Sequence, residues 1–217
     1  MKYCHTSFIA LCLLLFASFI KPAAAQKLQE WRAYSGMNLS LLGGKGDPYE
    51  DIRKLKAAPA FGLGASLKMA EKLDLELMFA YENKGRLLYS PSTPSKVRAN
   101  YHYLIFSAAS EHKLVKGSDR VFIGAGLYCG YLLRQQSVNA NRDLPTFQFT
   151  HLFRRYDLGP LATARWDFLS HGKLDFFLQL RAAFGLVNIH KDAFRPPPDT
   201  VLRNRSLVLA LGARLGR

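Results

Sequence analysis

The amino-acid sequence predicts an all-β protein: an eight-stranded antiparallel up-and-down transmembrane β-barrel, preceded by a cleaved signal peptide. Three observations predict this fold: an export signal at the N-terminus, a recurrent two-residue alternation of apolar and polar side chains, and connections that alternate between long and short. The chain has 217 residues, of which 49% are hydrophobic. This apolar fraction excludes a disordered chain, and three cysteines are too few for a disulfide scaffold.

The first 25 residues have the three parts of a secretory signal peptide. Lys2 supplies the positive charge, Ser7–Ile20 is a 14-residue apolar run, and Ala23–Ala25 supplies an A-x-A cleavage signal. The run is shorter than the roughly 18 apolar residues that mark a membrane-spanning helix. We therefore expect residues 1–25 to be removed during export.

The remaining residues, 26–217, are expected to form one barrel domain in the outer membrane of a Gram-negative cell. Loss of Lys2 and Lys21 lowers the net charge from +14 to +12. Cys129 is the only cysteine left in this domain, so we expect no intramolecular disulfide.

Eight segments carry the alternation expected of half-buried strands. In the third of them, Leu75, Leu77 and Phe79 alternate with polar residues such as Glu76 and Glu82. The five segments with a clear pattern are 31–41, 73–84, 155–168, 174–186 and 206–215. The three weaker segments are about 59–69, 99–114 and 120–134.

The connections between these segments alternate in length without a break. The short ones are 70–72, 115–119 and 169–173. The long ones are 43–58, 90–98, 135–152 and 190–204. Short periplasmic turns and longer extracellular loops are typical of outer-membrane barrels.

A soluble lipocalin-like barrel also alternates, but its apolar face points inward and its polar face meets water. Here the polar face combines charged residues with glycine and alanine, which suit a narrow interior better than a solvated surface. Trp31 and Trp166 fall at the predicted periplasmic ends of strands, and Tyr81, Tyr101 and Tyr156 fall toward the loops. This placement fits two aromatic girdles and favours a membrane barrel.

Eleven charged residues on the polar face are expected to point into the lumen. They are Arg32, Glu76, Glu82, Lys84, Arg155, Asp157, Arg165, Asp167, Asp175, Arg181 and Arg214. Unpaired buried charges cost several kcal/mol each, so we expect these side chains to pair across strands. An eight-stranded barrel is just wide enough for side chains to fill, which predicts a plugged lumen. A proton or ion path along the same residues is the alternative.

Short motifs along most of the mature chain resemble those of PorT-type outer-membrane β-barrel proteins of Gram-negative bacteria. The matching segments are Gly36–Ser40, Gly62–Leu67, Leu75–Leu77, Tyr81–Gly85, Gly126–Leu133, Tyr156–Gly159 and Gly185–Ile189. The resemblance implies an eight-stranded outer-membrane barrel. It also implies a role connected with protein secretion, although most members of the family have no assigned activity.

No catalytic, cofactor-binding or metal-binding residues are predicted. Gly124 and Gly126 begin a dinucleotide-like motif, but Cys129 replaces its third glycine and no helical pattern follows. His102 and Ser107 could form the pair that lipid A-modifying barrels use. Because they are five residues apart, they point to opposite faces of a straight strand. We therefore predict a non-enzymatic protein with a structural or accessory role; a lipid A-modifying enzyme and a small channel are the alternatives.

The expected partners lie at the outer leaflet. The four predicted extracellular segments, 43–58, 87–98, 134–155 and 190–205, carry net charges of +1, +2, +3 and +2. Lipopolysaccharide phosphates are the polyanion that faces them, and nucleic acid is not expected. An envelope or secretion protein is a further candidate, because the loops also contain the aromatic residues Phe147, Phe149, Phe153 and Phe194.

Overall fold

The structure is a computed structural model that describes residues 28–45, 47, 53–89, 96–114, 121–139, 147–191 and 201–216. The predicted signal peptide, residues 1–25, lies outside the described residues.

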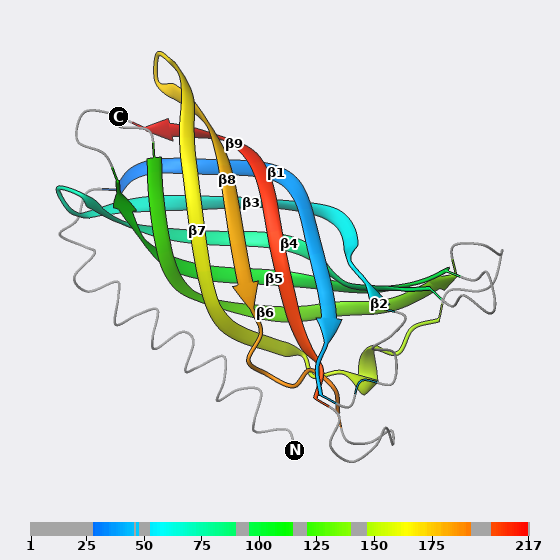
Figure 1. Cartoon of the computed structure of the whole chain (residues 1–217). Helices are drawn as coiled ribbons and strands as arrows, with labels where there is room; N and C mark the ends of the chain where they lie inside the picture. Colours follow the sequence, from blue (N-terminus) through cyan, green and yellow to red (C-terminus); the bar gives the residue numbers. More distant parts are fainter. Residues whose placement is uncertain are drawn as a thin grey trace.

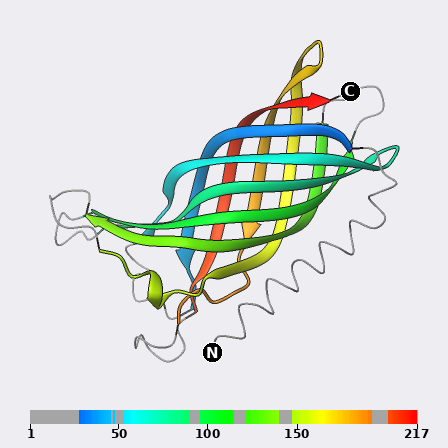
Figure 2. The ribbon, with the colours of Figure 1, turned by 180° about the vertical axis from the view of Figure 1, so that it is seen from behind.

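Eight long strands form one closed antiparallel barrel, as predicted (Figure 1). Their bounds are β1 Leu28–Gly43, β3 Lys56–Ala70, β4 Leu73–Tyr89, β5 Lys96–Lys113, β6 Val121–Asn139, β7 Tyr156–His171, β8 Leu174–Phe184 and β9 Arg203–Gly216. Each strand pairs with the next along the chain, and β9 pairs with β1 to close the barrel. The view from behind shows the same ring of tilted strands (Figure 2). Among the described residues, no helix is long and apolar enough to cross a membrane.

The predicted alternation matches the two faces of the barrel. Along β9, Val208 is 1% exposed and points into the lumen, whereas its neighbour Leu209 is 46% exposed on the outer face. The same alternation runs along β7, where Asp157 is buried and Leu158 is exposed. Outward leucines are stable there because the surroundings of a membrane barrel are hydrocarbon.

The strands extend further toward the loops than the alternation predicted. Residues 96–98 and 135–139, expected in connections, belong to β5 and β6, and β4 continues to Tyr89. A two-residue strand, β2 Arg53–Lys54, also pairs with β4. Figure 1 shows β4, β5 and β6 reaching beyond the rest of the barrel at this end. These segments lack an apolar outer face, so hydropathy did not mark them as strands.

A β-bulge interrupts the alternation near the loop end of β6. His102 of β5 pairs with Arg134, but the next residue, Tyr103, pairs with Leu132. Leu133 is therefore the extra residue, and both Leu133 and Arg134 are exposed before Gln135 returns to the interior. The bulge places Arg134 on the outer face, where strict alternation would have put it in the lumen.

The end of the barrel with short turns carries the predicted tryptophans. Trp31 and Trp166 are 61% and 51% exposed on the outer face. Gly172, in the turn between β7 and β8, has a φ of +64°, a conformation that favours glycine. At the loop end Tyr81 and Tyr156 take outward positions, but Tyr101 is only 2% exposed and points inward. The prediction that Tyr101 belongs to an outer girdle is wrong, because odd residues of β5 face the lumen.

Candidate functional site

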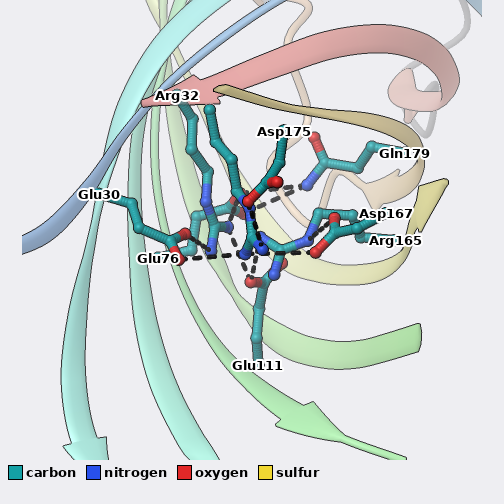
Figure 3. A network of polar contacts seen from close by, with 9 residues as sticks. Glu30, Arg32, Glu76, Glu111, Arg165, Asp167, Asp175 and Gln179 are labelled. Carbon is teal, nitrogen blue, oxygen red and sulfur yellow. Dashed lines mark hydrogen bonds and ion pairs between the residues drawn. The ribbon is translucent and has the colours of Figure 1, made fainter. Parts of the chain in front are cut away.

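The periplasmic half of the lumen is filled by a network of ion pairs (Figure 3). Arg32 Nη1 donates hydrogen bonds to Glu111 Oε2 at 2.7 Å and to Glu76 Oε1 at 3.0 Å. Arg165 Nη1 lies 2.9 Å from the same Glu111 oxygen. Glu111, from β5, thus joins two arginines from strands that are not neighbours, β1 and β7. These four side chains are at most 2% exposed, so each charge is neutralised by its neighbours rather than by water.

The network continues to the periplasmic rim through Arg214. Its guanidinium group donates to Asp175 Oδ2 at 2.9 Å and to Glu30 Oε1 at 3.0 Å, and lies 3.2 Å from Asp167. Asp167 in turn lies 3.1 Å from Arg165 Nε. The rim therefore connects β1, β7, β8 and β9 by charge as well as by backbone hydrogen bonds.

Toward the extracellular end, Asp157 of β7 is the centre of a second cluster. Its Oδ2 accepts hydrogen bonds from Tyr128 Oη and Asn204 Nδ2, both at 3.0 Å, and from Lys84 Nζ at 3.5 Å. The Lys84 ammonium group also lies 4.4 Å from the centre of the Tyr128 ring and 3.7 Å from Glu82. This cluster surrounds one lysine with two carboxylates and aromatic faces, an arrangement that stabilises a desolvated cation.

Arg181 lies between the two clusters, 4.0 Å from Glu82. Arg181 donates to Tyr34 Oη at 2.6 Å and to Ser107 Oγ at 2.9 Å. Phe177 lies nearer the periplasmic end, where it pairs with Asp167 and Gly212 on the neighbouring strands and has no exposed surface. Gly212 makes room for the ring, because a Cβ at that position would lie 2.2 Å from it.

An apolar cap closes the extracellular mouth of the barrel. We use "cap" for the buried residues Leu42, Tyr101, Leu132, Phe153, Ile189 and Leu202. The rings of Phe153 and Tyr101 pack edge to face with centroids 4.9 Å apart. Ile189 and Leu202 come from the two ends of the connection between β8 and β9, and Ile189 N donates to Leu202 O at 2.9 Å. The cap keeps water from the Asp157 cluster below it.

The structure brings nine of the eleven predicted luminal charges into these two clusters, places Arg181 between them and places the other one elsewhere. Arg155 is outside the network: it precedes β7, and its Nη1 donates to the backbone carbonyls of Leu132 at 3.1 Å and Leu133 at 3.2 Å. This corrects the prediction for Arg155. The reason is that β7 begins at Tyr156, so the two-residue period does not reach residue 155.

Sequence reasoning missed the residue at the centre of the first cluster. Glu111 lies in one of the weaker segments, where inward positions such as Tyr103 and Ile105 are apolar, so hydropathy gave no contrast between faces. Ser107 and Glu111 are four residues apart on the same strand, so they face the same side. Continuing the alternation from Ser107 would therefore have placed Glu111 in the lumen. Asn204 was missed for another reason, because it was assigned to a loop and belongs to β9.

Two residues considered for catalysis lie on opposite faces of β5, as the parity predicted. Ser107 is 2% exposed in the lumen, bonded to Arg181. His102 faces outward, and its Nδ1 is hydrogen-bonded to Tyr81 Oη. The barrel wall separates the hydroxyl from the imidazole, so this pair cannot act as nucleophile and base.

Comparison with known proteins agrees with the closed barrel. Residues 24–191 match the family described as "Outer membrane protein beta-barrel domain". The chain belongs to this family. It is therefore an outer-membrane β-barrel protein, and its charged lumen and apolar outer face are those of a membrane barrel. No match was found among curated protein sequences.

Solved structures of outer-membrane barrels are similar to the chain at low sequence identity. Neisserial surface protein A (NspA) is 10% identical with a TM-score of 0.42, over 86% of this chain and 97% of that one. Ail, the attachment invasion locus protein of Yersinia pestis, is 10% identical with a TM-score of 0.44, over 87% and 100%. The N-terminal β-barrel domain of Pseudomonas aeruginosa OprF is 8% identical with a TM-score of 0.43, over 88% and 100%.

Proposed function

We propose that the chain is a PorT-type, non-enzymatic outer-membrane barrel. Its lumen is closed to solutes, and it acts through contacts made by its extracellular face. Its role is structural or accessory, connected with secretion as the motif resemblance implies. Its partners are lipopolysaccharide and an envelope protein. The observation that carries the proposal is the filled lumen, with ion pairs in one half, the Asp157 cluster in the other and the apolar cap above them.

Apolar side chains packed in the lumen are stronger evidence that it is closed to solutes than the ion pairs alone. A conducting barrel needs a continuous polar path, and here Phe177 and the cap interrupt it. Leu42, Leu132 and Ile189 of the cap have no exposed surface. Opening such a path would separate apolar side chains that water cannot replace favourably.

Separation of His102 from Ser107 supports a non-enzymatic role over a lipid A-modifying one. Acyl transfer or hydrolysis needs a nucleophile within hydrogen-bond reach of its base. Ser107 Oγ instead accepts a hydrogen bond from Arg181 inside the lumen, where no lipid carbonyl can reach it.

The extracellular face offers fewer aromatic side chains than its sequence suggests. Phe147 and Phe149 are 52% and 40% exposed and stack with centroids 6.1 Å apart, so both are available to a partner. Phe153 is buried in the cap and is not available. Phe194 lies outside the described residues.

The test is complementation of a strain that lacks the gene. Wild type, His102→Ala, Ser107→Ala and a variant with residues 192–200 replaced by a short Gly-Ser linker are compared. The linker variant keeps Ile189 and Leu202, so the cap and barrel remain. We expect both point variants to restore the secreted-protein profile and to leave lipid A mass spectra unchanged, while the linker variant reaches the outer membrane without restoring the profile.

An altered lipid A spectrum in either point variant would overturn the proposal in favour of an enzyme. Full complementation by the linker variant would show that residues 192–200 are not the part of the extracellular face that carries the proposed role.

A further inference from the structure

We propose that the outer wall of the barrel holds one molecule of lipid A in a built site: an apolar groove for an acyl chain, below a row of polar side chains for a phosphate. The inference rests on the proposed function, because it specifies how this chain contacts lipopolysaccharide.

The groove lies on the lipid-facing side, where small residues of neighbouring strands leave a hollow of about 720 Å³. Ala33 and Ser35 of β1 and Ala213 of β9 form its floor. Phe61, Phe79 and Leu211 are among the large side chains around them. The volume lies within the usual range of small-molecule sites, about 300–1,000 Å³. A flat wall of leucines would offer lipid no such preferred position.

A row of large side chains, two of them aromatic, forms the extracellular end of the groove. Phe61, Tyr81 and Leu104 are direct cross-strand neighbours on β3, β4 and β5. The rings of Phe61 and Tyr81 stack with centroids 4.9 Å apart. The hydroxyl of Tyr81 is hydrogen-bonded to His102, so the apolar groove continues directly into polar groups.

Above this row a second set of cross-strand neighbours is polar. Asn83, His102 and Arg134 lie side by side on the outer faces of β4, β5 and β6. Arg134 is exposed on this face, directly across from His102. The bulge at Leu133 is what turns Arg134 outward, and bulges often re-aim a side chain beside a functional site.

The sign of this surface selects an anionic headgroup. The four carboxylates of β4, β5 and β6, which the structure describes along their whole length, all take inward-facing positions: Asp74, Glu76, Glu82 and Glu111. Arg98 adds a second exposed cation on the outer face of β5, four residues nearer the loops than His102. A phosphate at the outer leaflet therefore meets cations on this wall without an opposing carboxylate. Lipid A, which combines phosphates with acyl chains, fits both parts of the site.

The experiment is native mass spectrometry of the purified full-length barrel in detergent, with lipid A or phosphatidylglycerol added. Ala33→Leu fills the groove with a side chain that lipid tolerates, and Ala164→Leu makes the same change on the outer face of β7, away from the groove. Arg134→Gln removes the outward charge, and Lys173→Gln removes a charge from the periplasmic turn. Resistance of each barrel to unfolding in cold SDS confirms that it is folded.

We expect wild type to retain one lipid A in preference to phosphatidylglycerol. Arg134→Gln should weaken lipid A binding about tenfold, because a hydrogen-bonded charge contact is lost. Ala33→Leu should weaken binding of both lipids, and the two control variants should bind as wild type does. Equal lipid A binding by wild type, Ala33→Leu and Arg134→Gln would overturn the site while leaving the closed, non-enzymatic barrel intact. An altered lipid A mass after incubation would instead contradict the proposed function.

Discussion

The two halves of the lumen solve the problem of buried charge in different ways. In the periplasmic half, arginines and carboxylates neutralise one another directly, and Glu111 lies between Arg32 and Arg165. In the extracellular half, Asp157 accepts most of its hydrogen bonds from uncharged groups of Tyr128 and Asn204, below an apolar cap. The first half depends on complete charge pairing, whereas the second distributes stability over several weaker contacts.

This difference predicts unequal tolerance to substitution. When one carboxylate neutralises two arginines, its removal leaves both positive charges in an interior without water. A residue that is one of several partners can be removed with a smaller effect, because the others remain.

The largest expected effect is that of Glu111→Ala. The substitution removes the carboxylate that Arg32 and Arg165 share, so two buried positive charges lose a partner. Removing one partner of a buried ion pair destabilises a protein by about 3–5 kcal/mol. Unfolding by guanidinium in lipid vesicles, followed by the fluorescence of Trp31 and Trp166, measures the free energy. Glu71→Ala in an exposed periplasmic turn is the control and should not change it. A loss no greater than that of the control would show that the network does not stabilise the barrel.

A smaller loss is expected for Leu202→Ala, which tests the extracellular half. Leu202 is 5% exposed in the cap, and truncating a buried leucine costs about 2–5 kcal/mol depending on how far the site collapses. The same unfolding assay applies. If Leu202→Ala destabilised more than Glu111→Ala, the apolar cap rather than charge pairing would be the principal source of stability.

The smallest effect is expected for Tyr128→Phe. It removes one hydrogen bond to Asp157 but leaves those from Asn204 and Lys84, so we expect a loss of about 1–2 kcal/mol. Unfolding of Tyr128→Phe beside Glu111→Ala gives the ratio directly. Equal losses would mean that the Asp157 cluster is as intolerant as the periplasmic network and that the two halves do not differ.

The sequence predicted which face each residue takes far better than which residues meet. Alternation placed Arg32, Arg165 and Asp157 inward because hydrocarbon on one side makes the period visible. Which residues pair depends on the register and shear of the strands, because these set the level of each residue along the barrel axis relative to residues on neighbouring strands. No local sequence pattern encodes register or shear. Glu111 was missed for a different reason, because apolar residues fill the other inward positions of its segment and hydropathy shows no contrast between the two faces. Arg134 could not be placed because one inserted residue, Leu133, reversed the parity.

Segments beyond the membrane were the least predictable. Gln135–Asn139 and Arg53–Lys54 are strands without an apolar outer face. The cap could not be predicted either, because Phe153 lies in the connection between β6 and β7 and Ile189 and Leu202 lie in the connection between β8 and β9, and they meet only when the barrel closes.

Single-barrel recording in a planar lipid bilayer tests the central claim, that the lumen is filled, most directly. The full chain is inserted and the current is followed at constant voltage in concentrated salt. Because ion pairs, Phe177 and the cap occupy the lumen, we predict no steady conductance above that of the bare bilayer. A large, steady conductance comparable to that of a general porin would contradict the account.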